Sequence, residues 1–175
     1  MSRECGIADL AAIICQHLAN REIHAVLTGG AVVSIYSDDR YLTADLDFIT
    51  LSSMKRVKVA LEELGFHKEM GRYFSHPDTE LLIEFPPGPL SIGYSPVSST
   101  HKITIGNSTL NLLTPTQCVM DRLAAFYHWD DIQSLAQAIL VATLHDVDME
   151  YIAEWSIIEG KSELFNHFRD KLNKQ

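Results

Sequence analysis

An Asp-Leu-Asp triplet in the apolar segment from Thr43 to Ile49 restricts the fold of this chain more than any other feature of the sequence. Side chains alternate between the two faces of a β-strand, so Asp45 and Asp47 would project from one face and Leu46 from the other. Thr43 points the same way as the two aspartates. The apolar residues around the triplet indicate a buried strand, where two unpaired carboxylates are costly. The sequence therefore predicts a positive partner between Asp45 and Asp47.

A divalent metal ion is the usual partner of two adjacent carboxylates. Oxygen ligands with no His or Cys at matching spacing favour Mg²⁺ or Mn²⁺ over Zn²⁺. The alternative is that both aspartates are solvated at a strand end. A third anchor for a metal is Glu84, which lies in the predicted strand Glu80 to Phe85 and shares one face with Leu82. Glu80 is on that face too and competes for this role, although the start of a strand is more readily exposed.

Gly29 and Gly30 lie where a predicted strand, His24 to Thr28, gives way to a predicted helix, Ala31 to Tyr36. Such a junction exposes backbone N–H groups and the positive end of the helix dipole. Two glycines there would let a phosphate group approach the main chain closely. The alternative interpretation of an isolated Gly-Gly is a plain tight turn. We expect a phosphate site that faces the carboxylates.

The hydrophobic pattern divides the chain into an α/β part, residues 1–114, and an all-helical part, residues 115–175. In the first part it predicts helices over 7–18 and 54–64, a strand over 72–75, and a hairpin of strands 101–105 and 109–113 around Gly106-Asn107. Pro115 is a suitable first residue for a helix. After it, the pattern predicts helices over 116–129, 132–143, 147–159 and 162–172.

Composition and charge exclude several classes of protein. Hydrophobic residues make up 46% of the chain and charged residues 21%, which is typical of a globular protein. The net charge of −9 opposes an extended nucleic-acid surface, because phosphate binding depends on clustered Lys and Arg. The basic stretches 55–58 and 169–174 are interpreted as solvated helix faces. With no apolar run long enough for a membrane span, we expect a cytoplasmic protein without a membrane partner.

The cysteines and histidines carry no predicted chemistry. Cys5, Cys15 and Cys118 have no paired metal spacing, and the last two fall on apolar helical faces. We interpret the three as reduced packing residues. The eight histidines do not cluster in the sequence, so none receives a catalytic role.

Together, Gly29-Gly30, Thr43-x-Asp45-x-Asp47 and Glu84 on a later strand resemble the signature of the nucleotidyltransferase superfamily, the fold of DNA polymerase beta and the aminoglycoside nucleotidyltransferases. The match is best over residues 24–85. Within the superfamily, the chain is similar to small bacterial nucleotidyltransferase-like proteins that include toxins of abortive-infection toxin–antitoxin pairs. Gly30 departs from the pattern, because a serine is commoner there.

This resemblance implies a mixed sheet covered by helices and a helical C-terminal part. It implies two metal ions, Mg²⁺ or Mn²⁺, held by Asp45, Asp47 and Glu84 as the catalytic residues, and a nucleoside triphosphate such as ATP as substrate. Gly29, Gly30 and Thr43 would contribute to nucleotide binding. The acceptor would be a tRNA, a protein side chain or a small molecule, and an antitoxin-like protein partner would accompany a toxin.

Basic residues for the triphosphate are less evident. Arg40 and Arg122 are the candidates, and Asp131 is a candidate for orienting the acceptor. The alternative for Arg122 and Asp131 is an ordinary set of ion pairs on helix surfaces. Tyr127 and Trp129 are candidates for stacking a base, although aromatic residues at this spacing are commonly part of a core.

Three functional classes follow. The first is an active nucleotidyltransferase. The second is a catalytically inactive protein of the same fold that binds a nucleotide or a partner protein in a regulatory or antitoxin role. The third is a structural α/β protein in which the Asp-Leu-Asp triplet is a coincidence, which a buried strand argues against.

Overall fold

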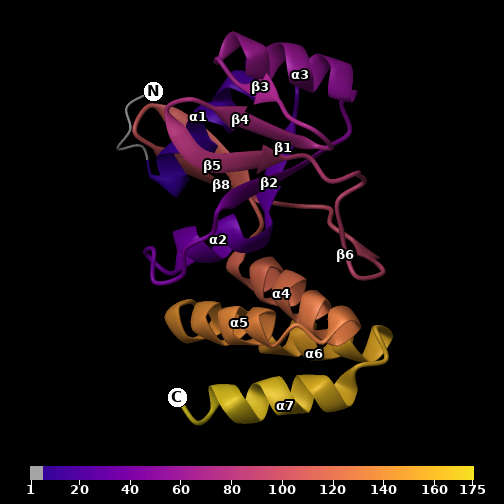
Figure 1. The fold of residues 1–175 in the computed structure, drawn as a ribbon. Coiled ribbons are helices and arrows are strands. Elements are labelled where there is room, and N and C mark those ends of the chain that lie inside the picture. Colours follow the sequence, from indigo (N-terminus) through magenta and orange to yellow (C-terminus); the bar gives the residue numbers. More distant parts are fainter. Residues whose placement is uncertain (1–5) are drawn as a thin grey trace.

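A seven-stranded mixed sheet organises the first two thirds of the chain in the computed structural model, which describes residues 6–175 (Figure 1). The strand order is β3-β4-β5-β2-β1-β9-β8. These strands are β1 (Ala25–Thr28), β2 (Asp45–Thr50), β3 (His67–Lys68), β4 (Tyr73–His76), β5 (Thr79–Glu84), β8 (His101–Ile105) and β9 (Ser108–Leu112). A separate short hairpin consists of β6 (Ser91–Ile92) and β7 (Ser95–Pro96).

The central strand β2 brings three parts of the chain together. It runs antiparallel to β1, with Thr28 opposite Asp47, and parallel to β5, with Asp47 opposite Glu84. Leu46 and Phe48 of β2 are fully buried on the face that carries the core. The period-2 alternation therefore leaves Asp45 and Asp47 on the other face, which is what the sequence predicted.

Three helices belong to the α/β part: α1 (Ile7–Ala19), α2 (Gly29–Tyr36) and α3 (Met54–Glu63). Helix α1 packs against β1 and β9 through buried residues such as Leu10 and Ile14. Helix α2 follows β1 without a loop, so it begins two residues earlier than the sequence predicted and includes both Gly29 and Gly30. This difference matters because it places the glycines inside the first helical turn.

Four helices form the C-terminal part: α4 (Pro115–Trp129), α5 (Ile132–Leu144), α6 (Met149–Ile158) and α7 (Ser162–Leu172). They form a layer beside the sheet, and α4 lies nearest to it (Figure 1). Helix α4 begins with a capping box in which Thr114 and Gln117 exchange hydrogen bonds, and Pro115 is its first residue. Helix α2 packs against both α4 and α5.

The fold class is confirmed as α/β with a mixed sheet and a helical C-terminal part, and most predicted elements agree with the structure to within two residues. The short strands β3, β6 and β7 were not predicted. Cys15 and Cys118 are buried with free thiols, whereas Cys5 lies outside the described residues. Among residues 6–175, no helix combines the length and the apolar character that crossing a membrane requires.

Candidate active site

Three carboxylates meet on the face of β2 and β5 opposite to the one that carries Leu46 and Ile83. One oxygen each from Asp45, Asp47 and Glu84 can be chosen so that the three atoms lie within 4.8 Å of one another. Parallel pairing explains the meeting, because Asp47 and Glu84 are direct partners in the register and Asp45 is two residues away on the same face. We call these residues the acidic cluster. The competing residue Glu80 is exposed and lies elsewhere on β5.

Glu84 is the most buried member of the acidic cluster, with 5% of its surface exposed. Its carboxylate forms an ion pair with Arg72, a residue that sequence reasoning did not identify. Tyr73 lies opposite Glu84 in the β4–β5 pair, and the nearby negative charge of Glu84 raises the pKa of the Tyr73 hydroxyl. The hydroxyl of Thr43 donates a hydrogen bond of 2.8 Å to Asp45 Oδ1, so Thr43 orients a member of the cluster.

The electrostatics of the acidic cluster call for a cation. Burial, followed by the charges of Asp45 and Glu84, raises the pKa of Asp47 to about 7, although Arg122 opposes the shift. Asp47 is hard to ionise because of its burial and because the carboxylates beside it carry the same charge. A divalent cation bound among them would compensate this repulsion. Three carboxylates in reach of one point are also the hard oxygen donors that Mg²⁺ and Mn²⁺ prefer. The donor set therefore fits the metal that the sequence predicts.

Helix α2 starts directly against the acidic cluster. Gly29 has a φ of +70°, and a Cβ atom built on it would lie 2.5 Å from Asp47 Oδ2, so a side chain there would collide with the carboxylate. A Cβ on Gly30 would lie 3.1 Å from Thr43 Oγ1. Thr28 precedes the helix without capping it through its side chain. The backbone N–H groups of the first turn thus lie beside the carboxylates, where a phosphate could approach them.

A cavity of about 380 Å³ contains the acidic cluster and joins the two parts of the fold. The sheet and α2 supply one side, and α4 supplies the other through Asp121 and Arg122. The Arg122 guanidinium donates to Asp121 Oδ2 at 3.0 and 2.5 Å and to Gln137 Oε1 at 3.4 Å. The remaining lining residues are Thr28, Gly29, Ile49, Arg72, Pro86, Leu90 and Ser91.

Two other predicted site residues, Arg40 and Asp131, do not line the cavity of the acidic cluster. Arg40 lines a separate cavity of about 760 Å³ between α5 and α7 and is not brought to the acidic cluster. The carboxylate of Asp131 caps helix α5, accepting hydrogen bonds from the N–H groups of Gln133 and Ser134 and from the Ser134 hydroxyl. The hydroxyl bond is the main reason that the pKa of Asp131 is lowered. This carboxylate has a structural task that needs no acceptor.

Sequence reasoning also passed over Arg72 and Asp121, both of which line the cavity. Arg72 is the first residue of a predicted strand, but only the β4–β5 register shows that it reaches Glu84. Asp121 received no predicted role. Its pairing with Arg122 inside the cavity depends on how α4 is placed against the sheet.

Comparison with solved structures places the fold. The chain is similar to an antigenic nucleotidyltransferase-like protein from Paracoccidioides brasiliensis, with a TM-score of 0.54, 15% identity, and coverage of 76% of this chain and 75% of that one. It is similar over 94% of its length to ANT(2")-Ia in complex with adenylyl-2"-tobramycin, which is covered to 97%, with a TM-score of 0.53 and 13% identity. A solution structure of the antibiotic-resistance factor ANT(2'')-Ia gives a TM-score of 0.53 and 13% identity over 92% of this chain and 90% of that one.

No protein-family model matches the chain, and no curated protein matches its sequence. At identities of 13 to 15%, the solved structures establish that the fold is like that of nucleotidyltransferase-like proteins.

Proposed function

We propose that the protein is a metal-dependent nucleotidyltransferase, which moves a nucleotidyl group from a nucleoside triphosphate to an acceptor hydroxyl. The observation that carries the proposal is the meeting of Asp45, Asp47 and Glu84 beside the uncapped start of α2 in one cavity. Carboxylates for a divalent ion and free N–H groups for phosphate oxygens are the two recognition elements that a metal-bound triphosphate needs. The fold similarity to nucleotidyltransferase-like proteins supports the same conclusion.

In the proposed reaction, the acceptor oxygen attacks the α-phosphorus in line with the bond to the leaving group. A new bond between oxygen and phosphorus forms, the bond between the α-phosphorus and the bridging oxygen breaks, and pyrophosphate leaves. A divalent ion held by the acidic cluster would neutralise charge on the triphosphate and ease loss of the acceptor proton. Glu84 accepts that proton, and its position at the end of β5 places it at the cavity.

The other residues of the cavity position the nucleotide. The N–H groups of Gly29 and Gly30 receive the β- and γ-phosphates, and Thr43 holds Asp45 in place through its hydrogen bond. Arg122 supplies a positive charge from α4, on the side opposite the sheet. We therefore propose that residues 1–114 carry the metal and that residues 115–175 complete the triphosphate site.

The first acceptor class to test is a small hydroxylated molecule. One similar structure holds adenylyl-2"-tobramycin, and the net charge of −9 disfavours RNA unless a basic partner compensates. A tRNA or a protein side chain is the second class. Transfer to tRNA, with growth arrest on expression that a neighbouring gene relieves, would support a toxin with an antitoxin-like partner.

The Arg72–Glu84 ion pair favours a second function. An arginine that occupies a metal ligand, together with Gly30 where a serine is commoner, fits an inactive protein that binds a nucleotide or a partner protein for regulation. In such a protein Arg72 would take the place of the ion.

The two functions are separated by one assay. The purified protein is incubated with Mg²⁺, each α-labelled nucleoside triphosphate, and tobramycin, total tRNA or a protein extract, and label in the acceptor is measured. Nucleotide binding is measured in parallel by calorimetry. Label transfer that Asp45→Asn abolishes and Asp170→Asn, a change at an exposed residue of α7, preserves supports the enzyme. Nucleotide binding without transfer supports the inactive protein. The absence of both transfer and binding would contradict a nucleotide site.

A further inference from the structure

Two large aromatic side chains are exposed near His128: Tyr94 at the turn of the β6–β7 hairpin and Trp129 in the last turn of α4. Tyr94 is 79% exposed and Trp129 76% exposed. The ring of His128 lies between them, with its centroid 6.0 Å from each of the other two and with edge-to-face geometry. We call these three residues the aromatic platform. Of the two residues predicted as candidates for stacking a base, Tyr127 is buried in the core and Trp129 is exposed.

A buried carboxylate holds the aromatic platform together. Glu159 has a side chain with no exposed surface, and each of its oxygens has a partner. Oε1 accepts a hydrogen bond of 2.7 Å from the backbone N–H of Tyr94, and Oε2 lies 2.9 Å from Nε2 of His128. Any side chain on Gly93 would collide with this carboxylate. The platform is therefore prebuilt by three separate segments of the chain.

The hairpin of β6 and β7 connects the aromatic platform to the acidic cluster. Figure 1 shows this hairpin extending from the sheet to the helical layer near α4 and α6. Trp155 of α6 donates a hydrogen bond of 3.3 Å to the carbonyl of Ile92, which fixes the hairpin there. Ser91, at the start of the hairpin, lines the cavity of the acidic cluster, whereas Tyr94 is at its turn. One short segment thus contributes to both places.

Helix α4 is a second connection between the acidic cluster and the aromatic platform. Asp121 and Arg122 line the cavity, and His128 and Trp129 follow each of them by seven residues, which is two helical turns on the same face. Seven residues of α-helix span about 10 Å. A molecule that reached from the α4 side of the cavity to the aromatic platform would need to cover about that distance along the helix.

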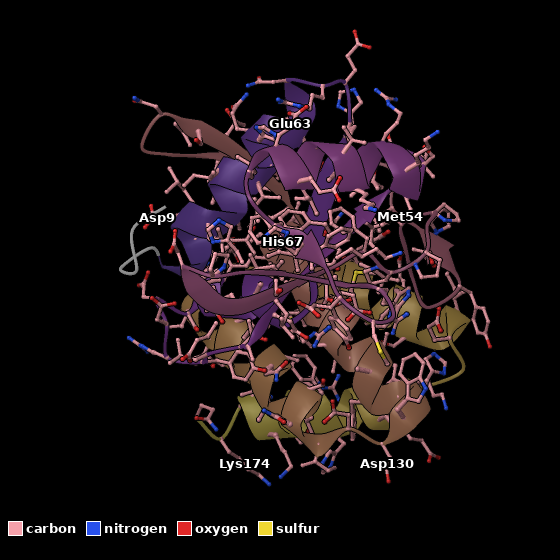
Figure 2. The ribbon with its side chains drawn as sticks, turned by 45° about the horizontal axis from the view of Figure 1, so that its top comes forward. Asp9, Met54, Glu63, His67, Asp130 and Lys174 are labelled. Atoms are coloured by element: carbon pink, nitrogen blue, oxygen red, sulfur yellow. The ribbon has the colours of Figure 1, made fainter. Side chains whose placement is uncertain are left out.

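The charges next to the aromatic platform indicate what kind of molecule it accepts. Glu159 contacts Tyr94 and His128, and the exposed residue Asp130 follows Trp129 directly in the chain. Asp130 is at the solvent edge of the helical layer, at the opposite end from Lys174 (Figure 2). Carboxylates around exposed rings repel a phosphate backbone, so a nucleic-acid strand is a poor fit. An uncharged or positively charged flat ring fits both the π-faces and the charges.

We infer that the aromatic platform binds a flat ring of the acceptor, a small neutral or cationic molecule that extends from that ring along about 10 Å of α4 to the cavity of the acidic cluster. The inference rests on the proposed function for the identity of the ligand as an acceptor. Binding at the platform itself needs neither metal nor nucleotide. A test of binding can therefore fail or succeed independently of any transfer assay.

Two glucosides, one with a phenyl group and one with a methyl group on the same sugar, test the inference. Phenyl β-D-glucopyranoside and methyl β-D-glucopyranoside are titrated into the metal-free protein, and saturation-transfer NMR measures the magnetisation that each receives. We expect saturation of the phenyl protons and little saturation of the methyl glucoside. Trp129→Ala should weaken binding of the phenyl glucoside by roughly tenfold, because stacking on an aromatic side chain contributes that order of affinity. Tyr151→Ala, which removes a half-exposed ring on α6, should leave it unchanged.

Glu159→Gln provides a second variant, in which Trp129 is intact but the carboxylate that holds His128 is altered. A weakened phenyl signal in this variant, at an unchanged melting temperature, supports a prebuilt platform. Equal signals for the two sugars, no phenyl signal in the wild type, or an equal loss in Tyr151→Ala would each overturn the inference.

Discussion

Gly29 lies against the Asp47 carboxylate so closely that a Cβ atom on Gly29 would stand 2.5 Å from Asp47 Oδ2. The start of α2 and the acidic cluster are therefore a single packed unit. This contact gives a physical reason for the sequence pattern of a glycine pair followed by Asp-Leu-Asp, since only glycine combines a φ of +70° with the absence of a side chain.

Gly29→Ala should abolish transfer, because the new methyl group displaces Asp47 from the acidic cluster. It should also destabilise the fold by more than the roughly 1 kcal/mol that positive φ alone costs an alanine. Gly71→Ala is the matched control, since Gly71 has a φ of +81° and nothing within 4 Å of its Cβ position. Thermal melts and label transfer of both variants check the prediction. Equal effects in the two variants would show that the contact with Asp47 is unimportant.

Asp47→Asn should stabilise the metal-free protein while abolishing transfer. The folded-state pKa of Asp47 is raised to about 7 from 3.8, so the folded state binds more protons than the unfolded state between these values. The ionised Asp47 carboxyl consequently lowers the free energy of unfolding. This loss of stability is close to zero below pH 4, grows as the pH rises and is largest above pH 7. The gain from Asp47→Asn should be a few kcal/mol at pH 8 and close to zero at pH 3. Melting in chelator across this range measures it, with Asp130→Asn as the control.

Arg72→Gln should tighten binding of Mn²⁺ to the nucleotide-free protein several-fold. Arg72 pairs with Glu84 in this structure, and a metal ion must displace it to use that carboxylate. The Arg72 side chain is 60% exposed, so loss of the ion pair itself should change stability little. Electron paramagnetic resonance of free Mn²⁺ gives the affinity. Weaker metal binding in the variant would mean that Arg72 supports the site rather than competes for it.

Asp131→Ala should lower stability by about 1 kcal/mol, the usual cost of losing a helix N-cap, and leave the transfer rate per folded molecule unchanged. Asp131→Asn keeps a capping side chain and should restore most of the stability. Chemical denaturation and initial rates distinguish this from a role in orienting the acceptor. A normal melting curve with slow transfer in Asp131→Ala would favour the acceptor role instead.

The acidic cluster was accessible to sequence reasoning because its signal is local. Asp45 and Asp47 share a face through the period of two in a strand, and Glu84 stands out as a charged residue at the end of an apolar strand. That Glu84 lies opposite Asp47 is a property of the β2–β5 register. The pattern of a single strand carries no information about it.

Residues that reach the cavity through tertiary packing could not be found in the same way. Arg72 contacts Glu84 only because β4 and β5 pair, whereas Arg40 is close to Asp45 in sequence but follows a turn that carries it toward α5 and α7. Trp129 is another example, since its helical spacing is compatible with a core. Its 76% exposure follows from its position in the last turn of α4.

The proposed function depends on a divalent ion that Asp45, Asp47 and Glu84 hold beside the start of α2. A crystal structure with Mn²⁺ and a non-hydrolysable triphosphate analogue tests it most directly, through the anomalous signal of the metal. We predict a peak at about 2.1 Å from carboxylate oxygens of all three residues, with phosphate oxygens near the N–H groups of Gly29 and Gly30. A peak elsewhere, or an analogue bound away from α2 with Arg72 still paired to Glu84, would contradict the proposed function.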